Sequence, residues 1–497
     1  MKKYLVGILI LSLLFFNCSE NEGIYNIKDY GAIGDGATLC TKAIQKAIDE
    51  CSANGGGKVI VPPGNYVTGP LFLKSSIYFE VFSGATLLFD DNIGNCPIID
   101  GKWEGIERKV YASLFTGHNL KNITITGRGT VNGQGKVWWD AHYENQRLRK
   151  EKGLIGREPD NPAESPLKVP RPRMVNLYNC NNVLISELTI LNSPAWTIHP
   201  VYCENVTIEK VSIIQPYESP NTDGINPESC KNVRISNCFV DCGDDCITIK
   251  SGYNEDGRRV AKPCENIVIS NCTFTHGRSA IGIGSEMSGN VRNITVSNCV
   301  FNGTLRGIRI KTERGRGGIV ENFRADNIIM DNVETAISID MYYGGNDITE
   351  LPVTIETPFF KNIHFSNITA INVENAAQIM GLPEAPVKGL SIVNSNFKAE
   401  NGFKVSFVKN TKFKDVNIDC KKGNPLIIDN GEAVDIDGFK AECKDSNESI
   451  ITLSNNTEVY IHNSSVKEST ETFLESINTE NLKLYNNWLH NATVIRK

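Results

Sequence analysis

The sequence predicts an all-β protein: a right-handed parallel β-helix closed at its N-terminal end by a short helix. Three observations support this fold class. A short phrase that begins with asparagine recurs along the chain, a second apolar–polar–apolar phrase keeps step with it, and long helical patterns are few. Length alone would suggest about three domains. Because a repeat fold grows as one unit, we instead expect one solenoid over residues 24–440, continued by degenerate coils over 441–497.

The first phrase is an asparagine followed by a short alternating strand, as in "KNITITG" and "KNVRISNC". From Asn182 onward the spacings between its copies are 23, 27, 34, 27, 29 and 40 residues, which suits one solenoid coil per copy. We expect the asparagine side chains to form a ladder that satisfies backbone groups at one turn. The copies begin at Asn122, Asn182, Asn205, Asn232, Asn266, Asn293, Asn322 and Asn362.

The second phrase places a strand in each coil at a constant position relative to the first. Two short strands per repeat, with no helix between them, indicate parallel β-helix coils, and the leucine signature of leucine-rich repeats is absent from the sequence. These strands centre on Ile198, Ile225, Ile247, Ile281, Ile308 and Ile337.

Two segments interrupt the repeat. The stretch from Thr41 to Gly57 has apolar residues at helical spacing followed by a glycine stop, so it predicts a helix that covers the open end of the first coil. The segment 140–170 is charged, contains proline and lacks the repeat, so we expect a surface loop or lid inserted in the solenoid.

The N-terminus is typical of an export signal. Two lysines precede an apolar run that is too short to span a bilayer, and Cys18 follows directly. Residues 1–17 therefore resemble a lipoprotein signal peptide, with Cys18 acylated and the protein anchored as an outer-membrane lipoprotein of a Gram-negative bacterium. A plain secretory signal with an incidental cysteine is the alternative. For the other 14 cysteines we expect stacked, buried thiols, because many recur in one "NC" context.

The composition limits the partners. A net charge of −6 argues against nucleic acid, which requires a broad basic face. The hydrophobic content of 40% and charged content of 22% are those of an ordinary globular protein, and we expect a monomer. Against this acidic background, the stretch "GIRIKTERGRGG" concentrates four cations.

Strand alternation separates those cations into two groups. Ile308 and Ile310 point into the coil, so Arg309 and Lys311 point out on the same face. One coil earlier, the equivalent positions are glycines, so no side chains project from that part of the outer face. Arg314 and Arg316 follow the strand, and we expect both to be solvated.

The residues just before two successive strands are aspartates, and a histidine stands just before the next strand. The spacings from Asp223 to Asp244, to His276 and to Arg309 are 21, 32 and 33 residues, one coil each, and Asp245 follows Asp244. At ~4.8 Å per coil, stacking brings these groups within roughly 15 Å on one face. Carboxyls so close cannot all ionise normally, so they supply an acid and a base together. Glycoside hydrolysis requires that pair, and the cations would hold an anionic sugar.

The ordered motifs "NTDG" (221–224), "GDD" (243–245), "HG" (276–277) and "RIK" (309–311) resemble the signature of glycoside hydrolase family 28, the polygalacturonases. The likeness covers about residues 24 to 440. One departure is Thr275, where the family usually has glycine. The resemblance implies hydrolysis of α-1,4-galacturonosyl linkages in pectin with inversion at the anomeric carbon, without a metal or cofactor.

The resemblance also implies roles. Asp244 would be the general acid, Asp223 and Asp245 would position and deprotonate the water, and His276 would support the acid. Arg309 and Lys311 would bind the galacturonate carboxylate, joined by Tyr342, with Tyr343 as the alternative. The substrate-binding residues expected are Arg309, Lys311, Tyr342, Asn221 and His199.

The phrases "RPRM" and "SPAWTIHPVY" resemble exo-acting members, and the 140–170 insertion would wall off one end of the cleft. His199 should face outward there, in a substrate contact or a structural role. Three alternatives stay open. They are a rhamnogalacturonan-directed galacturonidase of the same family, a Ca²⁺-dependent pectate lyase, and a non-catalytic carbohydrate-binding β-helix like a viral tailspike.

Overall fold

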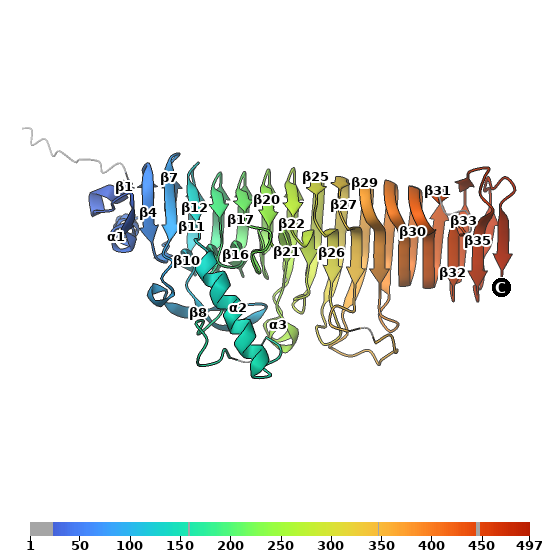
Figure 1. Ribbon diagram of the computed structural model, residues 1–497, viewed down its shortest axis with the longest axis horizontal. Coiled ribbons are helices and arrows are strands. Elements are labelled where there is room, and N and C mark those ends of the chain that lie inside the picture. The colour runs from blue at the N-terminus through green and yellow to red at the C-terminus, as the bar shows by residue number, and fades with distance from the viewer. Residues whose placement is uncertain (1–22, 158–159, 346, 444–447) are drawn as a thin grey trace, which may run out of the picture.

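The computed structural model describes residues 23–157, 160–345, 347–443 and 448–497, so the predicted signal and Cys18 lie outside the described residues. Parallel strands stack from coil to coil along one long axis, which confirms the right-handed parallel β-helix (Figure 1). Each coil contributes strands to three parallel rows, A, B and C. The sequence suggested two strands per coil, because the very short strands of row B follow row A directly and leave no separate pattern.

Row A carries the asparagine-led strands. It consists of β1 (Ile24–Asn26), β3 (Gly57–Val61), β6 (Ile77–Val81), β11 (Lys121–Thr126), β14 (Asn181–Ser186), β17 (Glu204–Glu209), β19 (Lys231–Ser236), β22 (Cys264–Ser270), β25 (Val291–Asn302), β27 (Ile319–Asp331), β29 (Phe359–Met380), β30 (Val387–Asp437), β33 (Thr457–His462) and β36 (Lys483–Tyr485).

Row B follows row A around a turn, and the long strands β25, β27, β29 and β30 run through both rows. Its other members are β2 (Asp35–Leu39), β4 (Gly64–Thr68), β7 (Ala85–Phe89), β12 (Thr130–Asn132), β15 (Thr189–Leu191), β18 (Ser212–Ile214), β20 (Phe239–Cys242), β23 (Thr273–His276), β31 (Lys440–Cys443) and β34 (Ser465–Val466).

Row C contains the second repeated phrase and runs into the ends of β29 and β30. It consists of β5 (Leu71–Phe72), β10 (Phe115–His118), β13 (Val175–Tyr178), β16 (Ile198–Val201), a single bridge at Ile225, β21 (Ile247–Ile249), β24 (Ser279–Ile283), β26 (Arg306–Lys311), β28 (Thr335–Asp340), β32 (Ile451–Ser454), β35 (Thr472–Ile477) and β37 (Thr493–Arg496). The strands within 448–497 continue all three rows.

The expected asparagine ladder is present. Asn232 donates to Asn205, Asn266 to Asn232, and Asn293 to Asn266, at 3.1, 3.1 and 3.0 Å. Each of these residues has a positive φ; that of Asn293 is 60°. Asparagine tolerates this left-handed conformation better than most residues, so it provides both the turn and the bond to the next coil.

The core is a column of inward side chains that pack on the coils before and after. The 13 cysteines whose side chains the structure describes are all buried, which fits the expectation of stacked thiols. Cys180, Cys203 and Cys230 lie on successive coils, and their thiols donate to main-chain carbonyls of the coil core.

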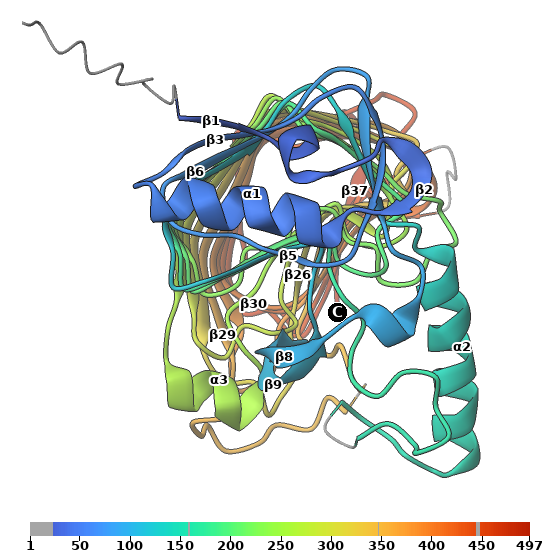
Figure 2. The ribbon, with the colours of Figure 1, turned by 90° about the vertical axis from the view of Figure 1, so that its left-hand side faces the viewer.

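Helix α1 (Thr41–Ala53) covers the N-terminal coil, as expected, and Figure 2 shows it lying across that end of the solenoid. Its buried side chains are Ile44, Ala47, Ile48 and Cys51. Among the described residues, every helix is too short or too polar to span a bilayer.

The 140–170 insertion is not simply a loop, because helix α2 (Lys136–Glu151) occupies its first part. Trp138, Ala141 and Asn145 form the buried stripe of this helix, and Trp138 packs against Phe89 and Tyr111. The sequence prediction failed because charges on the exposed face, such as the Lys136–Asp140 ion pair, dominate the composition. Two further elements were not expected: α3 (Asn254–Val260), and the antiparallel hairpin of β8 (Ile98–Trp103) and β9 (Ile106–Tyr111). All three elements lie alongside row C (Figure 1).

We expect the ladder to be a measurable source of stability. Asn293→Ala removes the side-chain bonds and places alanine in a left-handed conformation, so the free energy of unfolding should fall by about 1–2 kcal/mol in urea denaturation. Asn293→Gly loses the same bonds but tolerates the backbone angle, so its loss should be smaller. A glycine variant less stable than the alanine variant would contradict this account.

Candidate active site

Row C brings the motif residues onto one outward face. The register pairs Thr248 with Gly282, Gly282 with Arg309, and Arg309 with Ser338, which confirms the alignment expected from strand alternation. Asp223 lies two residues before the bridge at Ile225, and Asp245 two residues before β21. The turns holding these aspartates are joined through the main chain, where Gly224 N–H donates to the Asp245 carbonyl at 3.0 Å.

The three aspartates converge. One oxygen from each carboxyl lies within 4.8 Å of the others. Asp223 and Asp245 are almost fully buried, at 3% and 1% exposure, whereas Asp244 is partly exposed. Asp244 is therefore the carboxyl most accessible to a ligand above the cluster.

Lys311 forms a buried ion pair with Asp245, with Nζ 2.8 Å from Oδ2. We had expected this ammonium to face a substrate carboxylate, but in the structure its partner belongs to the protein. Gly282 makes room for the pair, because a Cβ there would lie 3.2 Å from Asp245 Oδ2. The space that the sequence predicts at this glycine is thus occupied by the Asp245 carboxyl.

The environment separates the proton affinities of the three carboxyls. Burial, and then the charge of Asp244, raises the pKa of Asp223 well above its usual range. Burial, and then Asp245, also raises the pKa of Asp244. Burial would raise the pKa of Asp245 as well, but the Lys311 ammonium more than offsets it, and the pKa is about 2. The cluster therefore places Asp245, which ionises readily, beside two carboxyls that hold their protons more tightly than usual.

The same carboxyls are the described residues best placed to hold a metal ion. One feature disfavours a cation there: the Lys311 ammonium already occupies an Asp245 oxygen. The arrangement fits proton transfer better than cation binding.

Of the two cations in the RIK motif, Arg309 is the one without a carboxylate partner among the described residues. Its Nε has no hydrogen-bond partner among the described residues, and its guanidinium lies 5.2 Å from the ring centre of Tyr343. Tyr343 is 42% exposed, whereas Tyr342 is 7% exposed and lies against Arg314. The tyrosine beside the motif cations is therefore Tyr343, the alternative in the sequence analysis.

His276 has a different partner from the one expected. Its Nδ1 lies 3.0 Å from Asp241, and among the described residues its ring makes no hydrogen bond to Asp244. Arg278 comes closer to that acid, with Nε 3.7 Å from Asp244 Oδ2. The sequence analysis missed both Asp241 and Arg278, although each lies within three residues of a motif.

His199 faces outward from β16, but the structure buries it completely. Its Nε2 lies 3.0 Å from Glu228, and Trp196 packs edge-on against its ring. The β8–β9 hairpin covers this group, since Trp103 stacks on Trp196 with ring centres 4.9 Å apart. His199 therefore faces outward as expected, but the hairpin covers it, so the structure favours the structural role over the substrate contact; the hairpin left no repeat signal in the sequence.

Arg314 and Arg316 are not the solvated residues we expected. Arg314 pairs with Glu384 at 2.7 Å and donates to two loop carbonyls. Arg316 is 3% exposed and stacks on Tyr253, 4.0 Å from the ring centre. Both tie the loops beside row C together.

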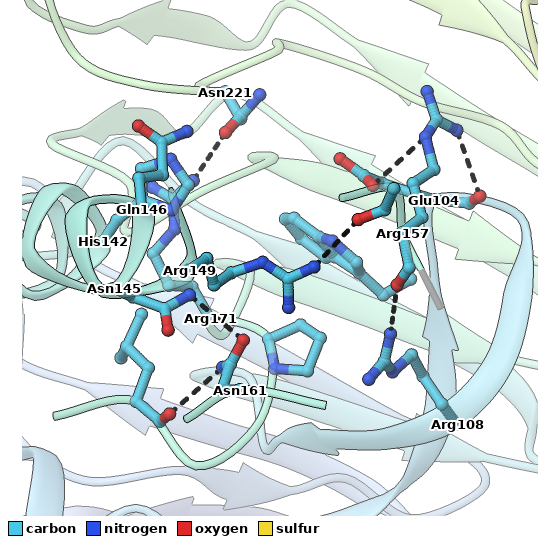
Figure 3. Close-up of a pocket in the computed structure, with 14 residues that line it drawn as sticks. Glu104, Arg108, His142, Asn145, Gln146, Arg149, Arg157, Asn161, Arg171 and Asn221 are labelled. Carbon is cyan, nitrogen blue, oxygen red and sulfur yellow. Dashed lines mark hydrogen bonds and ion pairs between the residues drawn. The ribbon is translucent and has the colours of Figure 1, made fainter. Parts of the chain in front are cut away.

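A groove of about 490 Å³ lies beside the aspartates between α2 and β26, with Gly243, Arg278 and Arg309 in its lining. Next to it, a basic pocket of about 150 Å³ lies between α2, the chain that follows it and the hairpin (Figure 3). Asn221, His142 and Gln146 line both spaces. The basic pocket is further lined by four arginines, Arg108, Arg149, Arg157 and Arg171.

Asn221 and Arg171 join the groove to the basic pocket. Arg171 is fully buried and donates to Asn221 Oδ1 at 2.7 Å and to the Pro194 and Pro220 carbonyls. Burial lowers its pKa to about 9. Figure 3 shows the Arg171–Asn221 bond and, across the pocket, Arg157 against Glu104. The sequence shows that segment 140–170 is charged, but it does not show which residues the segment faces.

Comparison with known proteins agrees with this geometry. Residues 51–398 match the family model described as glycosyl hydrolases family 28. A probable polygalacturonase of Vitis vinifera is 37% identical over 74% of this chain and 73% of its own length. An endo-polygalacturonase of Pectobacterium carotovorum is 29% identical over 68% of this chain and 81% of its own.

Among solved structures, the exopolygalacturonase of Thermotoga maritima superposes with a TM-score of 0.68 and 32% identity, over 79% of this chain and 91% of that one. With the family model covering most of the solenoid and its active-site row, the chain belongs to glycosyl hydrolases family 28 and is a glycoside hydrolase.

Proposed function

We propose that this protein is a polygalacturonase that hydrolyses α-1,4-galacturonosyl linkages in pectin, with inversion, from a chain end. The observation that carries the proposal is the separation of the carboxyls into proton-holding Asp244 and ionised Asp245. Hydrolysis requires an acid for the leaving oxygen and a base for the water. Because Asp244 is the exposed member, it protonates the leaving oxygen, while Asp223 and Asp245 position the water and the ionised Asp245 takes its proton.

Uronate specificity rests on the cations of the groove. Arg309 is partly exposed, lines the groove and lies beside exposed Tyr343, so its guanidinium can bind a substrate carboxylate at the bond to be cleaved. Lys311 contributes indirectly, by keeping Asp245 ionised. His276 supports the acid from the rim, where Asp241 orients its ring.

Action from a chain end rests on the shape of the groove. Relatives named for exo and endo action both resemble this chain, so their names do not decide the question. The groove leads past Asn221 into the basic pocket, which α2 and the hairpin bound. A pocket lined by arginines suits the terminal uronate of a chain better than a continuous polymer.

The N-terminus completes the proposal. Residues 1–17 serve as a lipoprotein-type signal, Cys18 carries the lipid anchor, and the protein acts as a monomer at the outer membrane of a Gram-negative bacterium. This part rests on the sequence pattern alone.

Replacing the acid should remove activity and leave the fold intact. Asp244→Asn should lower kcat on polygalacturonate at least a hundredfold, since general acid catalysis contributes about 10²–10⁴-fold. Reducing-end release measures the rate, and circular dichroism checks the fold. Asp419→Asn, an exposed aspartate on a later coil, is the matched control and should keep full activity. A near-normal rate for Asp244→Asn would refute the acid assignment.

The anomeric configuration of the product tests whether hydrolysis proceeds with inversion. Many inverting enzymes place their two carboxyls about 6.5–9.5 Å apart, with the water between them. Here the nearest oxygens lie within 4.8 Å, so the water would bind beside Asp223 and Asp245. Proton NMR early in the reaction should show the β anomer of the new reducing end first. If the α anomer forms first, the enzyme retains configuration and the water assignment is wrong.

Product analysis tests the direction of attack. With polygalacturonate, we expect monogalacturonate from the first time point, detected by anion-exchange chromatography, because the pocket admits one chain end. Viscosity should fall slowly. An early spread of oligomers would mean endo action. Faster release from rhamnogalacturonan in a parallel assay would move the preferred substrate to that polymer.

A further inference from the structure

Arg278 is a cation at the catalytic site to which the mechanism above gives no role. It lies in the turn between β23 and β24, and its side chain is 64% exposed. Its Nε lies 3.7 Å from Asp244 Oδ2, and among the described residues Asp244 is its one carboxylate partner. An ion pair this long, with so exposed an arginine, adds little to stability, so a structural role does not explain it.

The main chain fixes Arg278 one coil after the acid. Arg278 N–H donates to the Asp244 carbonyl at 2.9 Å, and Arg306 N–H donates to the Arg278 carbonyl at 3.0 Å. The turn is therefore stacked between the equivalent turns of the coils before and after. Gly277 permits this close stacking, because a Cβ there would lie 2.7 Å from the Asp244 carbonyl oxygen. The register of the coils thus places the arginine beside the acid.

Three arginines line the groove, and they differ in the carboxylates that already pair with them. Arg306 is 28% exposed and pairs with Glu334 at 3.3 Å. Among the described residues, Arg309 has no carboxylate partner, and Arg278 has only the catalytic Asp244. Arg278 and Arg309 are therefore the two arginines of the groove that can take an anionic group of the substrate.

These two arginines enter the groove from different elements. Arg309 projects from strand β26 of row C, where it pairs with Gly282 of the preceding coil. Arg278 stands four residues before Gly282, at the turn that leads from row B into row C. The bond that Asp244 protonates joins two galacturonates, and each of them carries one carboxylate. The groove therefore offers a separate cation for each of the two units.

We propose that Arg278 binds the carboxylate of one of the two galacturonates that flank the cleaved bond, while Arg309 binds the other, so that both units must be unesterified. This role rests on the proposed function, and it narrows the substrate to de-esterified galacturonan. A guanidinium presents parallel N–H donors to a carboxylate, and a methyl ester carries no charge to meet them. The alternative is that Arg278 only positions Asp244.

Methyl esters of digalacturonate test the two cations separately, because this substrate contains a single bond to cleave. One ester blocks the carboxylate of the non-reducing unit, and the other blocks that of the reducing unit. In the wild type, either ester should lower kcat/KM about tenfold to a hundredfold relative to the free acid, because a charge-assisted hydrogen bond is lost. Arg278→Met should cleave one of the two esters as fast as it cleaves the free acid. Arg309→Met should become indifferent to the other ester.

The pattern of discrimination decides between the two roles. If Arg278→Met still discriminates against both esters, or loses the same factor on all three substrates, Arg278 acts only on Asp244 and the proposal is wrong. The proposal is also wrong if Arg278→Met and Arg309→Met become indifferent to the same ester. Arg278→Lys keeps the charge but not the planar fork, so it should discriminate against both esters more weakly than the wild type.

Arg292→Met is the matched control. Arg292 is 43% exposed and pairs with Glu265 at 2.7 Å on row A, outside the lining of the groove. Its replacement should leave the discrimination of the wild type unchanged. Thermal unfolding checks each variant, and because Arg278 is exposed, Arg278→Met should unfold at the wild-type temperature. Arg278→Gln is a second uncharged variant for the same comparison.

A binding measurement keeps this inference separate from the proposed function. In the Asp244→Asn background, calorimetric titration with digalacturonate measures affinity without turnover. Adding Arg278→Met should weaken binding of the free acid about tenfold and leave binding of one methyl ester unchanged. If the wild type does not hydrolyse polygalacturonate, the proposed function fails, and this titration still tests Arg278. Equal affinities for the free acid with and without Arg278 would overturn the inference.

Discussion

The in-register stacking of parallel coils is the constraint on which the site depends. Each strand hydrogen-bonds to its equivalent one coil away, so neighbouring equivalent positions are about 4.8 Å apart. The register Thr248–Gly282–Arg309 shows this spacing across the active site. Residues that are a whole coil apart in the chain therefore become neighbours in the ladder. The solenoid therefore gathers charges at almost fixed distances, and the identity of each side chain decides the chemistry.

The same stacking forces unlike charges into a low-dielectric environment. Three carboxyls beside one another are unfavourable when buried, and a buried ion pair adds little net stability of its own. The Lys311–Asp245 pair is therefore better explained by its lowering of the pKa of Asp245. The glycines of β24 and of the turn after it make these contacts possible, because any side chain at Gly282 would meet Asp245.

The elements outside the solenoid give the site its shape. Helix α2, helix α3 and the β8–β9 hairpin all lie alongside row C, where the strands are short and the turns between coils are long. The core column is undisturbed, since the chain enters and leaves these insertions only at turns between the strands. Their contacts with the floor are polar and specific. Arg171 binds Asn221, and Arg157 binds Glu286, so the pocket walls are anchored to the coils that carry the carboxyls.

The sequence by itself determined the solenoid, the asparagine ladder, the capping helix and the common face of Asp223, Asp244, Asp245 and Arg309. These features are local or periodic, and strand alternation fixes which side chains point outward. Tertiary structure alone decided the partners. Lys311 pairs with Asp245, Tyr343 replaces Tyr342 beside Arg309, and the hairpin buries His199. Such contacts join the repeat to insertions that have no period, or select between adjacent side chains at a turn, and no sequence pattern specifies either choice.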